Sequence, residues 1–235
     1  MTFAQITAEL LGGFGLTCLL FLLTLLFSLP LGLLRSFCSM SRLRVLRTVT
    51  KVLIWIIRGI PLMLFICMIY YLPGLLGVSV NVFDSLDRYF TFRAGSRELL
   101  YYGSFCAVLL AFVINYSCYF SEILRGGIES IPRGQYEAGQ VLGMTKHQIF
   151  RHVILKQVIK RIVPPMSNEI ITLVKDTALA NTIAIPEIIK RAKDMAATQA
   201  LTWPLFYTAV FYLLFVGVLT VLLGRLEKKL SYFKA

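Results

Sequence analysis

The sequence predicts an all-α integral membrane protein with five transmembrane helices and a helical segment on the cytoplasmic side. Of its 235 residues, 57% are hydrophobic and only 15% are charged. Soluble domains are about 45–50% apolar and about 25% charged. Four uncharged runs each exceed the roughly 20 residues that a helix needs to cross a bilayer; they are 10–34, 59–83, 99–121 and 196–224. These observations exclude a soluble globular fold and predict one transmembrane domain over residues 1–235.

The net charge of +12 is also typical of nucleic-acid-binding proteins, but its distribution indicates membrane orientation instead. Lys and Arg cluster after the first, third and last uncharged runs, whereas segment 84–98 is balanced in charge. Because cytoplasmic loops of membrane proteins carry an excess of Lys and Arg, the three basic segments are predicted to be cytoplasmic. The N-terminus is then outside the cell and the C-terminus is inside.

Termini on opposite sides require an odd number of crossings, so the four uncharged runs leave one crossing unassigned. The missing span is predicted within 162–186, which is apolar but carries Glu169, Lys175 and Asp176. The five predicted spans are about 12–34, 53–77, 99–123, 164–185 and 203–224.

The fourth predicted span carries charges, which are costly inside a membrane and usually face a protein interior or a water-filled path. At 100° per residue, Glu169 and Asp176 share one helix face with Thr172, and Lys175 lies about 100° around the helix. Two carboxylates on one face favour a bound cation and a nearby lysine favours an anion; a zwitterionic amino acid supplies both. The alternative is that these residues form structural ion pairs with other helices, for example with Arg58 in the second span.

The basic segment at residues 125–161 is predicted to fold as a short helix, a turn and a longer amphipathic helix. Gly143 is placed to end the short helix. Thr145 is placed to cap the next helix, and apolar residues recur after it at helical spacing. Such a protruding element suits a mechanical role more than a chemical one.

The short helix carries Glu137, Ala138 and Gly139, whose small members are predicted to form a flat patch that a partner protein contacts. Together with Gly143, this patch resembles the EAA signature of bacterial ATP-binding-cassette (ABC) importers. The stretches RGIPLM (58–63) and NEIITLVKDTALA (168–180) resemble further motifs of the same proteins in the same order. From about residue 12 to 224, the chain resembles the polar amino acid uptake permeases, whose fold is MetI-like.

The resemblance implies a set of partners. The EAA-type helix would be the coupling helix that docks on a dimer of cytoplasmic ATP-binding subunits. A second permease, identical or similar, would complete the pathway in a bacterial plasma membrane, and an extracellular or periplasmic binding protein would deliver the amino acid. The chain has no Gly-Lys dipeptide, so it cannot form a P-loop. ATP and Mg would then belong to the partner, and this chain is expected to be a transport subunit without a cofactor, not an enzyme.

The resemblance also implies roles in the substrate pathway for a polar or cationic amino acid. Glu169 and Asp176 would meet ammonium or guanidinium groups, while Lys175 and Thr177 would hold the carboxylate or line the path. Arg58 and Thr172 are included in the same pathway.

Three positions depart from the family pattern. Gly139 replaces the usual Ala, Lys156 replaces the usual Pro, and Ala178 replaces the usual Ser. We expect the first change to keep the patch flat, the second to straighten the helix, and the third to remove a hydroxyl from the path.

Two other classes of protein remain as alternatives. A proton-coupled secondary transporter or channel would use Glu169 and Asp176 as proton carriers. A membrane enzyme is less favoured, because His147 and His152 lie in the basic segment without metal-ligand or acid–base spacing. No catalytic or metal-ligating residue is therefore assigned. The sequon beginning at Asn115 lies inside the third span and is interpreted as a chance match.

Overall fold

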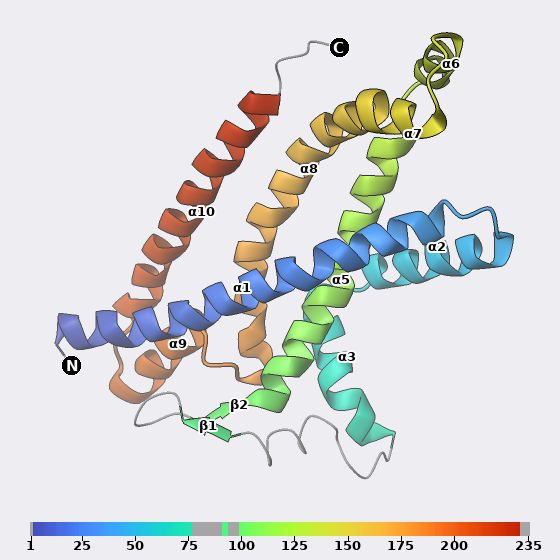
Figure 1. The fold of residues 1–235 in the computed structure, drawn as a ribbon. Helices are drawn as coiled ribbons and strands as arrows, with labels where there is room; N and C mark the ends of the chain where they lie inside the picture. The colour runs from blue at the N-terminus through green and yellow to red at the C-terminus, as the bar shows by residue number, and fades with distance from the viewer. Residues whose placement is uncertain (1, 77–90, 94–98, 231–235) are drawn as a thin grey trace.

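The computed structural model describes residues 2–76, 91–93 and 99–230, which form helices joined by short connections and one small antiparallel sheet (Figure 1). Strands β1 (Thr91–Arg93) and β2 (Leu99–Tyr101) pair with Thr91 opposite Tyr101. Three helices are long and apolar enough to cross a membrane: α1 (Phe3–Ser39), α5 (Tyr102–Glu129) and α10 (Trp203–Leu230). Most of the predicted outer segment 84–98 lies outside the described residues.

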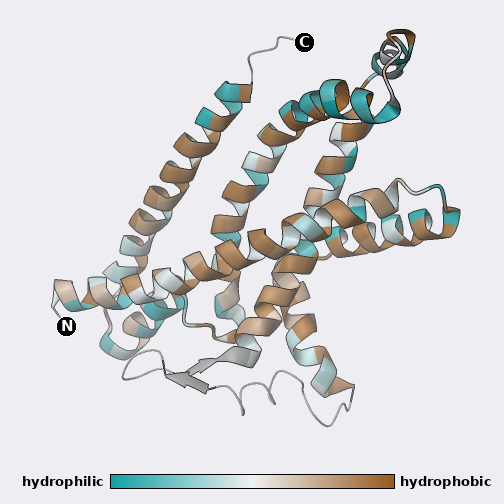
Figure 2. Ribbon diagram, in the orientation of Figure 1, coloured by the Kyte–Doolittle hydropathy of each residue, from teal (hydrophilic) through white to brown (hydrophobic). Residues whose placement is uncertain are grey.

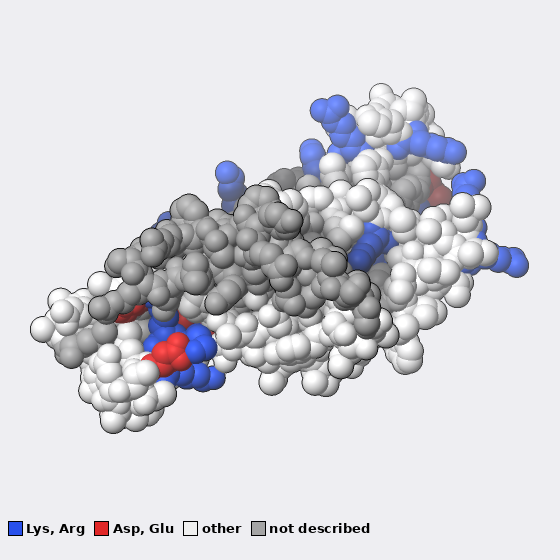
Figure 3. Space-filling model, turned by 90° about the horizontal axis from the view of Figure 1, so that it is seen from below, with Lys and Arg blue, Asp and Glu red and all other residues white. Residues whose placement is uncertain are grey.

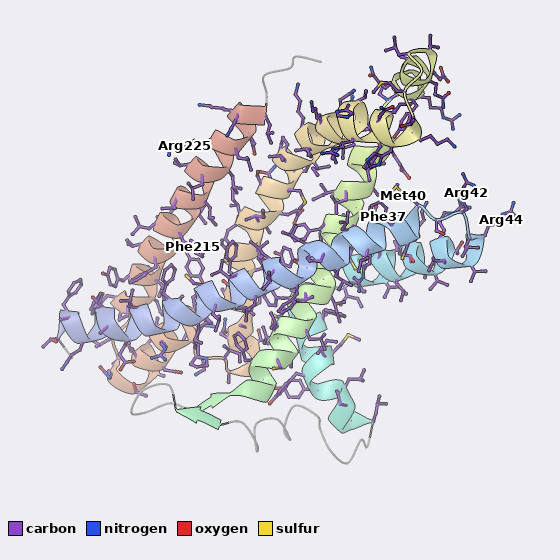
Figure 4. All side chains as sticks on the ribbon, in the orientation of Figure 1. Phe37, Met40, Arg42, Arg44, Phe215 and Arg225 are labelled. Carbon is purple, nitrogen blue, oxygen red and sulfur yellow. The ribbon has the colours of Figure 1, made fainter. Side chains whose placement is uncertain are left out.

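Helix α1 lies obliquely across α5 and packs closely against it in the core (Figure 1). Small residues allow this approach: a Cβ atom added at Gly32 would lie 2.9 Å from the Cβ of Phe120 on α5. Aromatic side chains also pack α1 against α10. Phe215 of α10 reaches towards α1 (Figure 4), with its ring centroid 5.5 Å from that of Phe14 and 5.2 Å from that of Phe21.

The predicted second span, about 53–77, is not one straight helix in the structure. The chain instead forms α2 (Arg44–Gly59) and α3 (Leu62–Leu75), which are bent by 105° at the break. Proline disfavours the helical conformation of the residue before it, and Ile60, before Pro61, is extended with φ −92° and ψ 129°. On length and composition, the bent pair is a fourth candidate span.

The fourth predicted span, 164–185, differs from the structure at both ends. Helix α8 (Leu155–Asp176) begins earlier, and from Thr177 the chain continues as a 3-10 helix, η2 (Thr177–Ile183), which stops at the left-handed Ala184. A further helix that the sequence analysis did not predict, α9 (Ile188–Gln199), follows. Among the described residues, α8 does not qualify as a candidate span by composition, so five crossings remain a prediction.

The segment between α5 and α8 has the predicted form of helix, turn and helix. Helix α6 (Arg133–Val141) ends in a Schellman motif: the N–H of Gly143 bonds to Gln140 O, and that of Met144 bonds to Gly139 O. Gly143 has a φ of +72°, which confirms its role as the residue that ends the helix.

Thr145 caps helix α7 (Lys146–Gln148) through a capping box, which confirms the second predicted cap. The chain then passes through a π turn, η1 (Ile149–Ile154), into α8. Lys156 therefore lies within a regular α-helix, but directly after this π turn.

Short polar helices lie at both ends of the molecule. α6 and α7 lie at the same end of the molecule as the C-terminal end of α10, and α9 lies at the other end, beside the N-terminal part of α1 (Figure 1). The helices at these two ends of the molecule are largely hydrophilic, whereas the long helices between them are mostly hydrophobic (Figure 2). Seen from the α9 end, acidic and basic side chains gather at one edge (Figure 3), in agreement with the ion pairs Lys190–Asp194 and Arg191–Glu9.

Candidate functional site

A polar cavity of about 400 Å³ lies where the α2–α3 break meets α5 and α8. It brings together four of the six residues predicted for the substrate pathway: Arg58, Glu169, Thr172 and Asp176. The other lining residues are Gly59, Ile60, Pro61, Leu62, Asn115, Tyr116 and Tyr119. A straight second span would not have produced this site, because the linker of the bend forms one of its walls.

Arg58 reaches the cavity from the last turn of α2, which ends one residue later. The carboxyl end of a helix favours a cation, because its free carbonyl groups carry partial negative charge. The guanidinium lies 4.8 Å from the ring centroid of Tyr119, and its Nη1 lies 3.9 Å from Oε2 of Glu122. Both contacts are on the α5 side, so the arginine stands at the cavity wall.

Asp176 is the last residue of α8, directly before the 3-10 helix η2. The hydroxyl of Tyr116 donates to Oδ2 of Asp176 at 2.6 Å. Tyr116 is only 2% exposed and its ring stacks on Phe112, so this donor is firmly positioned. The carboxylate of Asp176 is therefore held at the cavity wall by a buried donor.

The predicted alternative, in which the acids of the fourth span form structural ion pairs, finds no close pair among the described residues. Among the described residues, neither Glu169 nor Asp176 has a Lys or Arg nitrogen within 4.0 Å. Arg58 pairs instead with Glu122 of α5, which also takes a bidentate contact from Arg125. Within the part of the chain that the structure describes, the cavity thus contains two carboxylates without a directly paired cation.

Lys175 and Thr177, also predicted for the pathway, do not line this cavity. Lys175 is exposed. Thr177 is fully buried, and its hydroxyl donates to the carbonyl of Val174 in the last turn of α8. Asn115 and Tyr116, in contrast, line the cavity although the sequence analysis assigned them no role there. Their only sequence signal is that they are polar within an uncharged run.

The predicted contact patch on α6 is only partly exposed. Glu137 and Ala138 are exposed, but Gly139 is buried, and a Cβ added there would lie 2.6 Å from Cγ1 of Ile149. The interpretation of Gly139 as part of a flat outer surface is therefore wrong; its small size lets α6 pack on the π turn. Val141 and Leu142 at the end of α6 are 87% and 78% exposed.

Long apolar helices around a charged cavity define a polytopic membrane transport protein. The sequence profile of the "binding-protein-dependent transport system inner membrane component" family matches residues 28–232. The chain therefore belongs to this family. It is a permease of the amino acid ABC transporter type, a multi-pass membrane protein that serves as a transport subunit.

The relatives carry amino acid transport names. The chain is 32% identical over 226 residues to the L-cystine transport system permease protein TcyB of Bacillus subtilis (strain 168), a match that covers 95% of this chain and 87% of that protein. It is 30% identical over 224 residues to the arginine transport system permease protein ArtQ of the same organism, with 94% and 92% covered. A putative glutamine transport system permease protein GlnP of Rickettsia bellii (strain RML369-C) is 30% identical over 210 residues, with 88% and 86% covered.

Solved structures agree with the family. The crystal structure of an amino acid ABC transporter with histidines matches with a TM-score of 0.80 and 27% identity, and covers 97% of this chain and 100% of that chain. An inward-facing structure of the MetNI methionine ABC transporter matches with a TM-score of 0.65 at 17% identity, covering 98% of this chain and 100% of that chain. The latter shows likeness of fold alone.

Proposed function

We propose that this permease moves a polar or cationic amino acid inward, driven by ATP hydrolysis in separate subunits that dock on α6. The observation that carries the proposal is the cavity with Arg58 on one wall and Glu169 and Asp176 on another. Its volume of about 400 Å³ lies within the range of about 300–1,000 Å³ typical of small-molecule sites.

The charges of the cavity favour a cationic amino acid over a neutral one. Arg58 matches an α-carboxylate, and guanidinium–carboxylate pairs form strong, oriented hydrogen bonds. Glu169 and Asp176 match an α-ammonium and a cationic side chain. Seven residues of α-helix separate these acids by about 10 Å along the axis, so a long side chain reaches from one to the other. A neutral amino acid leaves one of the two carboxylates uncompensated, which is costly.

The α6 surface supports the docking part of the proposal. Val141 and Leu142 project from the end of α6 beyond Glu137 and Ala138. Exposed apolar residues of this size on a hydrophilic helix are typical of a protein contact. Gln157 of α8 donates to Gln135 of α6, and Arg161 of α8 donates to the carbonyl of Ser130, which directly follows α5. A force applied to α6 is therefore passed to α8 and α5, the helices that carry the acids and Tyr116.

The same proposal fixes the orientation and the partners. The α6 end is cytoplasmic and meets a dimer of ATP-binding subunits, which hold ATP and Mg. The α9 end faces outward, where a substrate-binding protein delivers the amino acid. A second permease, a copy or a similar chain, completes the pathway. Support for this orientation comes from Arg42 and Arg44 at the α1–α2 turn and Arg225 near the end of α10 (Figure 4), because basic residues favour the cytoplasmic side.

The test is ligand binding to the complete importer in nanodiscs, with radiolabelled L-arginine, L-glutamine and L-cystine as probes, followed by uptake into ATP-loaded proteoliposomes. We expect saturable binding of at least one probe and uptake only with ATP. Arg58→Gln should weaken binding at least about tenfold, the loss of a charged hydrogen bond. Arg47→Gln, which removes an exposed cation of the same helix away from the cavity, serves as the matched control.

Three results would contradict the proposal: none of the probes binds, Arg58→Gln and Arg47→Gln behave alike, or uptake follows a proton gradient without ATP. The last result would favour a proton-coupled secondary transporter that uses Glu169 and Asp176.

A further inference from the structure

A second cavity, of about 480 Å³, adjoins the first on the side that faces α6. Its walls come from α2 and α5, and its main lining residues are Lys51, Trp55, Arg58, Tyr119, Glu122 and Arg125. Arg58, Gly59 and Tyr119 line both cavities. The two cavities are therefore separated only by residues that they share.

The second cavity lies further along α5 towards α6. The first cavity uses α5 residues 115, 116 and 119, and the second uses 119, 122 and 125. The mean position shifts by about five residues, which is about 8 Å along a helix. A molecule that moves from the first cavity towards α6 enters the second next.

The two cavities have opposite charge. The first is lined by two carboxylates and one guanidinium, whereas the second is lined by three cations and the single carboxylate of Glu122. Arg125 contacts both Glu122 and Glu129, so its charge is largely compensated. Lys51 and Arg58 then give the second cavity its capacity to attract an anion.

Arg58 is placed to serve both cavities. Its side chain is 41% exposed, and its contacts are the Tyr119 ring at 4.8 Å and Glu122 at 3.9 Å. A partly exposed ion pair and a cation–π contact each hold a guanidinium weakly. The arginine can therefore turn to either side of Tyr119 at small cost.

From this arrangement we propose that the second cavity is an exit subsite for the α-carboxylate of the transported amino acid. Arg58 holds the carboxylate in the first cavity and turns past Tyr119, and Lys51 then receives it on the α6 side. The cations that attract the carboxylate repel the ammonium group of the same molecule. The amino acid therefore stays in the second cavity only briefly before it is released. The inference rests on the proposed function, because it needs an amino acid in the first cavity.

The experiment measures initial rates of L-arginine uptake by the complete importer in proteoliposomes, or of L-glutamine if that is the probe that binds. Lys51→Gln should lower the turnover number about tenfold while KM and equilibrium binding change less than about twofold, because one charged contact of about 1.4 kcal/mol is lost only on the exit path. Lys51→Arg should restore turnover, since it keeps the cation. Arg47→Gln, on the same helix but outside both cavities, is the matched control and should leave uptake unchanged.

A Glu169→Gln variant, measured alongside, separates the two proposals. If Glu169→Gln does not weaken binding of the probe, the proposed function itself is wrong. If Glu169→Gln weakens binding but Lys51→Gln leaves turnover within about twofold of wild type, a change too small for a lost charged contact, only the exit subsite is overturned.

An anionic lipid headgroup is the competing source of a negative charge. If the Lys51→Gln effect is present with phosphatidylglycerol in the vesicles but absent in pure phosphatidylcholine, the cavity binds lipid and the inference is overturned. An effect of equal size in both kinds of vesicle supports the exit subsite.

Discussion

Replacing Asp176 by asparagine tests the charge balance of the first cavity with little change in shape. The asparagine side chain of the Asp176→Asn variant still offers an oxygen to the Tyr116 hydroxyl, which donates to Asp176 at 2.6 Å in the native protein. The substitution therefore removes one negative charge and keeps the hydrogen bond that positions the side chain. The lining then carries one carboxylate, Glu169, and one guanidinium, Arg58, and is neutral overall.

The size of the effect follows from the lost interaction. A hydrogen bond to a charged partner contributes about 1.5–3 kcal/mol, so affinity for L-arginine should fall about 10- to 150-fold. Affinity for L-glutamine, whose single ammonium is satisfied by Glu169, should not fall, because the substitution removes the carboxylate that a neutral amino acid leaves uncompensated. The ratio of the two affinities is thus a more specific readout than either affinity alone.

The assay is equilibrium binding of both radiolabelled probes to the complete importer in nanodiscs. Asp194→Asn is the matched control, because Asp194 is exposed on α9 and pairs with Lys190 outside the cavity. An equal loss for both probes in Asp176→Asn would show general damage to the site. Unchanged arginine affinity would refute the assignment of Asp176 to the ligand.

Three further substitutions test the framework around the site. Gly143→Ala places a side chain on a left-handed residue with φ +72°, which costs about 1–2 kcal/mol. ATP-driven uptake by this variant should fall while binding of the probe persists. Equal uptake by the variant and the wild type would argue against a coupling role for this turn. Gly32→Ala places a Cβ 2.9 Å from that of Phe120 and should destabilise the folded protein by about 1–3 kcal/mol, measured by thermal melting. Gly15→Ala is the control, because a Cβ there has no neighbouring atom within 4 Å, and it should melt like the wild type. Similar melting temperatures for the two variants would contradict this prediction. Burial raises the pKa of Glu187, the buried cap of α9, to about 7. This group therefore stabilises the fold most below its ordinary pKa of 4.5 and loses that contribution as the pH rises through 7, so Glu187→Gln should flatten the melting temperature between pH 4.5 and 7, and an unaltered pH profile would contradict the assignment.

The sequence was most informative where the signal is local. Long uncharged runs predicted α1, α5 and α10, because hydropathy depends on composition alone. The helical period placed Glu169, Thr172 and Asp176 on one face, and all three line the same cavity. The caps of α6 and α7 were also predicted from single residues, since a left-handed glycine and a capping box each need only a few neighbours.

Features that depend on the tertiary fold were missed. The break before Pro61 was hidden because an apolar run continues through it, and hydropathy does not report backbone direction. Tyr116 gave only the weak signal of a polar residue within an uncharged run, although its hydroxyl positions Asp176. Gly139 was assigned to the wrong face of α6, because the side on which α6 packs is set by Ile149. Helix α9 was not predicted, because its charged residues separate it from the apolar runs on either side and no membrane-length run marks it.

The most direct test of the central claim is a cryo-electron microscopy structure of the complete importer in a nanodisc, saturated with L-arginine or with the probe that binds best. We expect ligand density in the cavity bounded by the α2–α3 break, with the carboxylate beside Arg58 and a cationic group beside Glu169 or Asp176. A saturated complex with this cavity empty and the ligand bound elsewhere in the membrane domain would contradict the assignment of the substrate site.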